Sequence, residues 1–582
     1  MKRILDEGHN RAGVGACQNW CDWRCRNDRK RLTFPNKTVQ LRVHKDAIFN
    51  IASLFFPPVF CPMSDKRRFL KHTFTFGVGG VIVQVTPFLL LPLYTNYLTP
   101  SEYGILDVLF LTSEIINIVF LVGGIRLAAM TFFKQAESEE ARRRIAITLS
   151  LLLWFFVAVS INVSVYFVDY IDRLLLTGER DILVCGLTVM LLESLVAVPM
   201  TLTQARLESL RFVLTCIVMS VARMGLCVYF VAGLHWGILG FLAAQVIVTS
   251  TSIVYLTSRE FRIGSLCPDM TKWKDILKFV LPLVPGGIFT YLLWVSSRFS
   301  LIHFGPYTNS VAATAAVGLY ALASRLMNVS EYMGTEPMRR VWTAVMYDVY
   351  KKPDASKVFG GFMLRLLCVK AFAVLFISLF AVEIVRVLSG PAFHDAAAFI
   401  PLFGLHFLLK LFILQMNDTF YITRKTFFIP ICTASTLPFV FLFMYLLVPR
   451  WGIAGALCAY ILAETFYAGF VYCFTQRLFY VHYPFGKMAL LFTLTILCYG
   501  LSLLCGHGIE LSPLTPEQFQ ELTRWDKLLD AWKRIQWLSI IAKIGIIFLW
   551  GMLIWFSDIL VQEDKALVLR VLKRGLEKLH LQ

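Results

Sequence analysis

The chain has 582 residues, of which 57% are hydrophobic and 16% are charged, and its mean hydropathy is +0.65. Soluble domains average roughly 45–50% apolar and about 25% charged residues, so this composition excludes an ordinary soluble globule and an intrinsically disordered chain. The formal net charge of +18 does not indicate nucleic-acid binding, because the basic residues collect in loops between apolar runs, where they set membrane orientation.

Residues 1–62 form a polar, basic segment that differs from the rest of the chain. The apolar stretch at 51–60 is too short and too interrupted by proline to cross a membrane. Cys17, Cys21 and Cys25 share a helical spacing but have no fourth ligand nearby, so we expect no metal site there. We expect this segment to be disordered or to be an extension before a true translation start at Met63.

From residue 63 onward, apolar runs of about 20 residues follow one another, each long enough to cross a hydrocarbon core of about 30 Å. They predict an all-α polytopic membrane protein with about 14 transmembrane helices. The expected spans are 73–95, 104–126, 145–168, 182–203, 212–233, 237–257, 276–298, 314–335, 361–383, 396–416, 427–448, 452–474, 487–506 and 537–559. Lysine and arginine concentrate in alternate loops, which predicts that both termini are cytoplasmic.

Residues 481–582 are expected to hold a terminal pair of helices, an outer interfacial helix and a basic cytoplasmic tail. The run Thr515-Pro-Glu-Gln518 has the spacing of a capping box with proline at the first helical position. The helix that follows would carry Trp525 and Trp532 beside basic side chains. That combination is typical of a helix lying on a membrane surface.

Two short patterns recur at nearly the same separation. Trp236-Gly-Ile-Leu-Gly240 opens the sixth expected span, and Trp451-Gly-Ile-Ala-Gly455 opens the twelfth, 215 positions later. The glycines of Tyr103-Gly104 and Gly318-Leu-Tyr320 lie 214 positions apart. Chance is one explanation, because small residues recur wherever membrane helices pack closely. The other is a duplicated six-helix unit, which predicts two parallel lobes, 63–260 and 261–480, around a central cavity.

Ionisable side chains inside the expected spans are costly and are functional candidates by default. Lys370, Lys410, Glu383 and Asp418 lie near enough to span ends that we expect them to snorkel to the membrane surface.

Arg223 and Arg325 are different, because each has at least two helical turns of its span on either side. Each would have to face a counter-ion, protein or water. Arg223 could pair with Glu193 and Arg325 with Glu331, or both arginines could line a cationic cavity. The two interpretations stay open at this point.

Arg126 and Arg298, at the ends of the second and seventh spans, favour the cavity. A guanidinium matches phosphate oxygens in a bidentate fork, so such a cavity would attract an anionic cargo such as a pyrophosphate. We therefore predict a substrate-binding set comprising Arg126, Arg223, Arg298 and Arg325. The candidates for coupling groups or counter-ions are Glu114, Glu193 and Glu331.

No nucleotide-binding, metalloprotease or hydrolase pattern occurs in the sequence, so we expect neither an enzyme nor a cofactor. The histidines at 303, 394, 406 and 507 are isolated in the sequence. Asp169 and Asp172 are the nearest candidates for a metal-dependent glycosyl transfer, and they are equally compatible with a solvated helix boundary.

The stretch Pro87-Phe-Leu-Leu-Leu-Pro-Leu-Tyr-Thr-Asn-Tyr-Leu-Thr-Pro-Ser-Glu-Tyr-Gly-Ile-Leu-Asp107 resembles the opening of the polysaccharide-biosynthesis flippases. This family, which serves O-antigen and exopolysaccharide synthesis, belongs to the multidrug/oligosaccharidyl-lipid/polysaccharide (MOP) exporter superfamily. Val317-Gly-Leu-Tyr-Ala-Leu-Ala-Ser-Arg325 and the second Trp-Gly pattern resemble the same family. The resemblance covers roughly residues 64–505, and residues 1–62 depart from the family pattern.

The resemblance implies an inner-membrane protein of bacteria or archaea that moves a polyprenyl-pyrophosphate-linked oligosaccharide from the cytoplasmic to the outer leaflet by alternating access. It also implies membrane lipid, a polysaccharide polymerase and chain-length machinery as partners, in lipopolysaccharide or exopolysaccharide synthesis. Two alternatives stay open. A drug/cation antiporter of the same superfamily would have an acidic cavity, and a membrane glycosyltransferase or polymerase would depend on Asp169 and Asp172.

Overall fold

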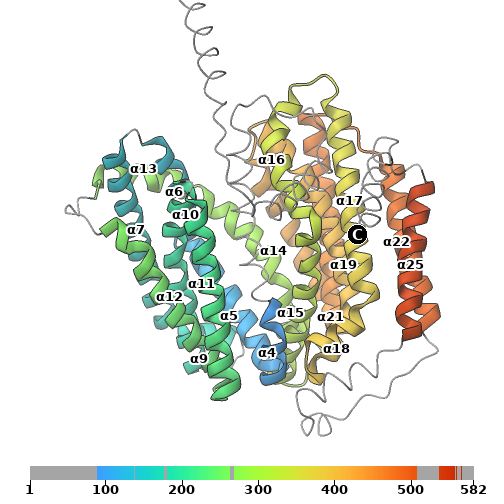
Figure 1. Ribbon diagram of the computed structural model, residues 1–582, viewed down its shortest axis with the longest axis horizontal. Coiled ribbons are helices and arrows are strands. Elements are labelled where there is room, and N and C mark those ends of the chain that lie inside the picture. The colour runs from blue at the N-terminus through green and yellow to red at the C-terminus, as the bar shows by residue number, and fades with distance from the viewer. Residues whose placement is uncertain are drawn as a thin grey trace, which may run out of the picture. The chain divides into compact units, whose positions relative to one another are not determined.

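The computed structural model describes residues 88–557 apart from 137, 176–179, 207, 262–267 and 507–536, together with 559 and 565. Within these ranges every regular element is a helix (Figure 1). Eleven helices are long and apolar enough to cross a membrane, or up to 12 if one bent pair forms a span. The predicted all-helical, multi-pass membrane protein is confirmed, while the count of 14 spans stays a prediction.

Several predictions fall outside the described residues. They concern the N-terminal segment 1–62 with its cysteines and the start at Met63, most of the first expected span, the interfacial helix after Thr515, and the basic tail.

The first described helices are α4 (Leu91–Tyr97), α5 (Pro100–Val119) and α6 (Val122–Gln135). α5 begins with a complete capping box, in which the Thr99 hydroxyl accepts from the Glu102 amide and the Glu102 carboxylate accepts from the Thr99 amide. The pair α5–α6 bends by 56° at Leu121, whose φ is 66°. The span expected at 104–126 is therefore broken, and Arg126 belongs to the first turns of α6.

Among the next helices, those at 139–166, 197–205 and 270–280 share an apolar core with α6 that includes Ile125, Leu149, Val198 and Val280. Two short 3₁₀ or π segments lie among them, η1 (Ser194–Val196) and η2 (Val228–Gly233). The helices are α7 (Glu139–Tyr166), α8 (Val168–Leu175), α9 (Arg180–Glu193), α10 (Ala197–Ala205), α11 (Ser209–Cys227), α12 (Gly237–Phe261) and α13 (Met270–Val280).

The remaining helices run from residue 283 to 556. α14 packs along α21, α17 along α19, and α22 lies beside α25 (Figure 1). They are α14 (Leu283–Phe304), α15 (Ser310–Ser330), η3 (Glu331–Thr335), α16 (Glu336–Tyr350), α17 (Ala355–Leu379), α18 (Ala381–Leu388), η4 (Pro391–Phe399), α19 (Ile400–Met416), α20 (Asp418–Ile422), α21 (Phe428–Leu478), α22 (Phe485–Gly506) and α25 (Trp537–Phe556).

The first glycine of each Trp-Gly pattern has a positive φ. Gly237 has a φ of +55° and Gly452 has a φ of +52°. Residues other than glycine rarely adopt a positive φ. Gly452 also marks a kink that divides the 51 residues of α21 into two helices, which correspond to the spans expected at 427–448 and 452–474. A duplicated unit would place a positive φ at both positions.

The glycines of the other recurring pattern face one another across α5 and α15. A Cβ on Gly104 would lie 2.0 Å from the carbonyl oxygen of Thr314, and a Cβ on Gly318 would lie 2.0 Å from the carbonyl oxygen of Pro100. Next to them, the hydroxyls of Ser101 and Thr314 form a hydrogen bond of 2.6 Å. Only glycine allows the two backbones to approach this closely.

Candidate functional site

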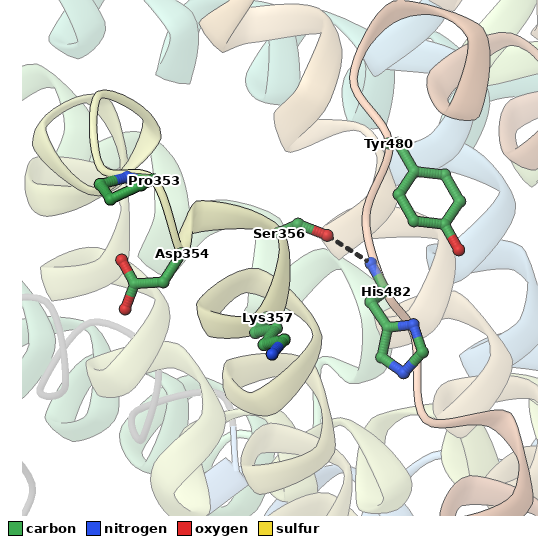
Figure 2. Close-up of a pocket in the computed structure, with 6 residues that line it drawn as sticks. All are labelled: Pro353, Asp354, Ser356, Lys357, Tyr480 and His482. Atoms are coloured by element: carbon green, nitrogen blue, oxygen red, sulfur yellow. Dashed lines mark hydrogen bonds between the residues drawn. The ribbon is translucent and has the colours of Figure 1, made fainter.

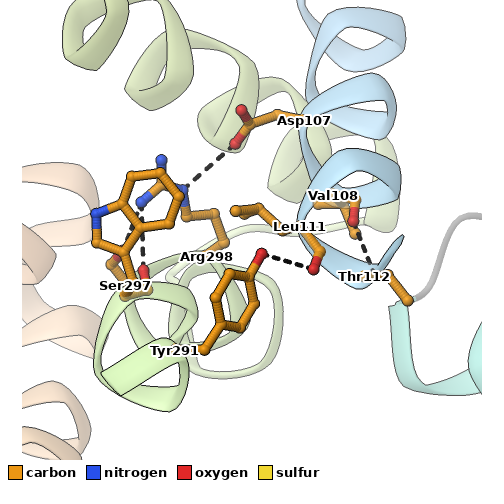
Figure 3. Close-up of polar contacts among 8 residues, drawn as sticks. Asp107, Val108, Leu111, Thr112, Tyr291, Ser297 and Arg298 are labelled. Atoms are coloured by element: carbon orange, nitrogen blue, oxygen red, sulfur yellow. Dashed lines mark hydrogen bonds and ion pairs between the residues drawn. The ribbon is translucent and has the colours of Figure 1, made fainter. Parts of the chain in front are cut away.

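Arg298 of α14 forms a buried ion pair with Asp107 of α5 (Figure 3). Its Nε lies 3.3 Å from Oδ2 of Asp107, and the two side chains are only 7% and 8% exposed. Nη1 donates to the hydroxyl of Ser297 and the carbonyl of Trp294. The guanidinium also lies 4.5 Å from the ring centroid of Tyr320. Arg298, predicted to bind cargo, is therefore held by the protein's own groups in this conformation.

Arg325 of α15 is the second cation at this contact. Its guanidinium carbon lies 5.2 Å from the ring centroid of Tyr103, a buried residue of α5 whose ring packs edge-on against Phe393. Within the described ranges, no carboxylate forms an ion pair with Arg325. The suggested pairing of Arg325 with Glu331 is wrong, because Glu331 binds two lysines instead.

Together Tyr103, Asp107, Arg298, Tyr320 and Arg325 form what we call the α5–α15 cluster. Its residues lie on α5, α14 and α15, and the hydroxyl of a further α14 residue, Tyr291, donates to the Leu111 carbonyl of α5 at 2.6 Å (Figure 3). Two of the three sequence motifs that carry the family resemblance, 87–107 and 317–325, therefore meet in space. Asp107 interacts electrostatically with both arginines, so the cluster holds two guanidiniums and one carboxylate. Such an excess of buried positive charge favours an anion.

Asp107 was missed in the sequence analysis as a candidate site residue. The available signal was a carboxylate within an apolar span, seven residues into α5, which is costly unless a cation satisfies it.

Arg223 of α11 forms an ion pair with Glu193, the last residue of α9. Nη2 and Oε1 are 2.8 Å apart, and the Gln245 amide of α12 donates to the other carboxylate oxygen. Of the two interpretations left open for Arg223, the structure shows the ion pair. Together with Gln245 the pair connects α9, α11 and α12, and it lies outside the α5–α15 cluster.

Arg126 is exposed on α6, while Glu114 is half-buried on α5. Neither forms an ion pair with another described residue, although their charges interact with one another. Arg126 therefore lies outside both the α5–α15 cluster and the Arg223–Glu193 pair.

Lys370, Lys410 and Glu331 form a second charged group, between α17, α19 and η3. The Lys370 side chain is 0% exposed, and its Nζ lies 3.1 Å from Oε2 of Glu331. Lys410 lies 3.9 Å from Oε1, and both ammonium groups lie 5.0 Å from the ring centroid of Phe407. The expectation that Lys370 snorkels is wrong, because a neighbouring helix covers it and supplies its counter-ion.

Glu383 and Asp418 do not snorkel either. Glu383 forms an ion pair of 2.5 Å with Lys543 of α25, a helix remote in sequence. The Asp418 side chain is 4% exposed and accepts hydrogen bonds from Trp342 at 2.9 Å and Gln415 at 2.7 Å. Both carboxylates therefore connect helices instead of reaching the membrane surface.

A pocket of ≈ 420 Å³ opens at the start of α17, against the segment after α21 (Figure 2). The Ser356 hydroxyl accepts a hydrogen bond of 2.9 Å from the backbone amide of His482. The pocket is lined by Pro353, Asp354, Ser356, Lys357, Tyr480 and His482. It contains none of the residues predicted to bind cargo.

A family model described as polysaccharide biosynthesis protein matches residues 69–335. Comparison with curated protein sequences gives no match. The fold is similar to that of the lipid II flippase MurJ in an inward closed conformation, with 11% identity, a TM-score of 0.59 and coverage of 82% of this chain and 98% of that one.

Two further solved structures have a similar fold. One is an inward-facing multidrug resistance MATE transporter of the MOP superfamily, with 14% identity, 69% and 97% coverage of this and that chain, and a TM-score of 0.54. The other is a MOP superfamily transporter from Pyrococcus furiosus whose binding pocket has reverse polarity, with 15% identity, 73% and 97% coverage and a TM-score of 0.51. The resemblance noted in the sequence is therefore confirmed: residues 69–335 match the polysaccharide biosynthesis protein family, and the chain has the fold of MOP superfamily transporters.

Proposed function

We propose that this protein is a flippase that moves a polyprenyl-pyrophosphate-linked oligosaccharide from the cytoplasmic to the outer leaflet by alternating access, for surface polysaccharide synthesis. The observation that carries the proposal is the α5–α15 cluster, in which Arg298 is ion-paired with Asp107 and Arg325 has no ion pair with a described carboxylate. Guanidinium groups bind phosphate oxygens in a bidentate fork, and their field repels organic cations. The family match and the MurJ-like fold support the same cargo class.

The two arginines would act at different stages. Arg325 has an aromatic contact with Tyr103 but no ion pair with a described residue, so it can meet a pyrophosphate without losing a carboxylate. Arg298 becomes available only when α5 carries Asp107 away. Cargo binding to Arg298 would therefore favour separation of α5 from α14, which links binding to the conformational change.

Arg126 and Arg223 would have different roles. Arg126, exposed on α6, would make an early contact with the anionic headgroup. Arg223 would hold α9 and α11 together through Glu193 and would not touch cargo. The protein would lie in the inner membrane with both termini cytoplasmic, and would deliver its cargo to a polysaccharide polymerase and chain-length machinery.

Arg325 provides the test, in the host strain lacking this gene and complemented with variants. Arg325→Ala should abolish surface polysaccharide and leave complete lipid-linked oligosaccharide on the cytoplasmic leaflet. Arg325→Lys should restore export only in part, because it keeps the charge but loses the fork. Arg450→Ala, at an exposed position of α21, is the matched control and should export normally. Undiminished export in Arg325→Ala would contradict the proposal.

The enzyme alternative has a different signature. Blocked assembly would accumulate truncated lipid carriers, and replacing Asp169 and Asp172 by alanine would abolish activity. Asp169 forms an exposed ion pair with Arg180 at 3.1 Å, the arrangement of a solvated helix boundary. We therefore expect the Asp169→Ala/Asp172→Ala double variant to export normally.

A further inference from the structure

The pocket at the start of α17 lies where two membrane-spanning helices begin (Figure 2). α17 begins at Ala355, directly after the lining residue Asp354. α22 begins at Phe485, three positions after the lining residue His482. Both helices are long and apolar enough to cross a membrane. The beginning of a span lies at the level of the lipid headgroups, where exposed tyrosines such as the lining residue Tyr480 are common.

The walls of this pocket are fixed by contacts within the protein. The Ser356 hydroxyl accepts from the His482 amide, and a Cβ on Gly360 of α17 would lie 2.0 Å from the carbonyl oxygen of His482. The side-chain amide of Gln476 bonds to both the N–H and the carbonyl of Val481 at 3.0 Å. The pocket is therefore formed without a ligand, and its ≈ 420 Å³ falls within the range of about 300–1,000 Å³ that is usual for small-molecule sites.

Asp354 occupies the N-cap position of α17 but does not use its side chain as a cap. An aspartate at this position ordinarily accepts a hydrogen bond from an amide of the first helical turn. Here the carboxylate accepts none, whereas the backbone carbonyl of Asp354 accepts from the amides of Lys357 and Val358. Asp354 also forms no ion pair with another described residue. Its carboxylate is therefore available to a cation at the edge of the pocket.

Lys357 and His482 bring unused polar groups to the same pocket. Lys357 is exposed and forms no ion pair within the described part of the chain, although Asp354 lies only three positions before it. The His482 imidazole is exposed and has no hydrogen bond to a described residue. Figure 2 shows Lys357 between Asp354 and His482. The pocket therefore presents a carboxylate on one side of an ammonium group and an imidazole on the other.

These opposite charges favour a ligand that carries both charges itself. A simple anion would be attracted by Lys357 and repelled by Asp354. A headgroup with a phosphate and a primary ammonium satisfies both, because phosphate oxygens accept from Lys357 and His482 while the ammonium donates to Asp354. The trimethylated ammonium of a choline headgroup has no N–H to donate, so it would be held less tightly.

We propose that this pocket binds the headgroup of an ethanolamine phospholipid, with Asp354 on the ammonium and Lys357 on the phosphate. Phe485 and Leu490, exposed on α22, would contact the acyl chains as these enter the membrane. One lipid would then join the start of α17 to the segment 479–484. None of the lining residues belongs to the α5–α15 cluster, so this site goes beyond the proposed flippase function and does not depend on it.

The test measures how well a lipid protects the pocket from a thiol reagent. Tyr480→Cys places a thiol in the lining, in the full-length protein with its native cysteines changed to serine. The protein is reconstituted in nanodiscs of phosphatidylcholine, alone or with part of it replaced by phosphatidylethanolamine or phosphatidylglycerol. The rate of reaction with a water-soluble maleimide is then measured. Thr343→Cys, at an exposed position of α16, is the control thiol and should react equally in all three lipids.

Phosphatidylethanolamine should slow the labelling of Tyr480→Cys at least about fivefold relative to phosphatidylcholine alone. Asp354→Asn and Lys357→Gln should each remove most of this protection, because each breaks one charge-assisted hydrogen bond to the headgroup. Asp348 and Lys351 form an exposed ion pair of 3.7 Å in the same region. Asp348→Asn and Lys351→Gln are therefore the matched controls and should keep the full protection.

Conservative variants separate loss of the charges from a change of structure. Asp354→Glu and Lys357→Arg keep the charges and should retain part of the protection, with an unchanged size-exclusion profile. Equal labelling of Tyr480→Cys in all three lipids would overturn the proposal. Protection by phosphatidylglycerol that equals that by phosphatidylethanolamine and increases in Asp354→Asn would also overturn it, because the pocket would then bind a simple anion.

Discussion

Alanine at Gly318 should drive α5 away from α15. The new Cβ would lie 2.0 Å from the carbonyl oxygen of Pro100, whereas ordinary contacts begin at 3.4 Å, so the two backbones must separate by about 1.4 Å. A backbone oxygen cannot rotate aside as a side chain can. Overpacking of this kind costs roughly 1–3 kcal/mol, which corresponds to a shift of about five- to 150-fold against the arrangement in which the helices touch.

A cysteine pair measures this shift. Ser101→Cys on α5 and Thr314→Cys on α15 replace two hydroxyls that are 2.6 Å apart, so the rate at which an oxidant joins them by a disulfide reports how closely the helices approach, in a protein whose native cysteines are changed to serine. We expect Gly318→Ala to slow disulfide formation by at least about fivefold at a fixed pH, and Gly104→Ala to act in the same direction because its Cβ would meet the Thr314 carbonyl. Gly361→Ala in α17 is the matched control, since its Cβ would meet nothing within 4 Å. Equal rates for Gly318→Ala and Gly361→Ala would refute the view that this glycine contact holds α5 to α15.

Three further predictions concern charges and a helix cap. Asp107→Asn leaves Arg298 buried without its carboxylate and should lower unfolding stability by about 3–5 kcal/mol, measured in detergent; an unchanged stability would show that Arg298 has another partner. Glu331→Gln should lower the melting temperature more than Lys370→Met does. The former leaves two ammonium groups without their carboxylate, whereas the latter replaces one buried charge by an apolar chain. The reverse order of melting temperatures would contradict the charged group formed by Lys370, Lys410 and Glu331. Asp269→Ala removes the N-cap of α13 and should cost about 1 kcal/mol at neutral pH. Because the Thr271 hydroxyl lowers the pKa of Asp269, this contribution should disappear as the pH falls through that pKa, and a difference that persists in acid would oppose the assignment.

The sequence alone determined the class of the protein and most of its helices. Apolar runs of membrane-spanning length predict the helices whatever their neighbours are. The capping box at Thr99 and Glu102 is local, and the left-handed turn at Gly237 and Gly452 needs glycine at its own position only. The family motifs likewise lie within short stretches and needed no knowledge of packing.

Only the tertiary structure decided which charges meet. Arg298 and Asp107 are 191 positions apart, and helix packing alone brings them together. The same holds for Lys370 and Glu331. The position of Lys370 near a span end suggested that its side chain reaches the membrane surface, but a neighbouring helix covers this side chain. Helical periodicity specifies the face of a helix on which a side chain lies, but not the helix that covers that face. The excess of guanidinium over carboxylate between α5 and α15, on which the proposed function depends, is therefore a property of the packed bundle.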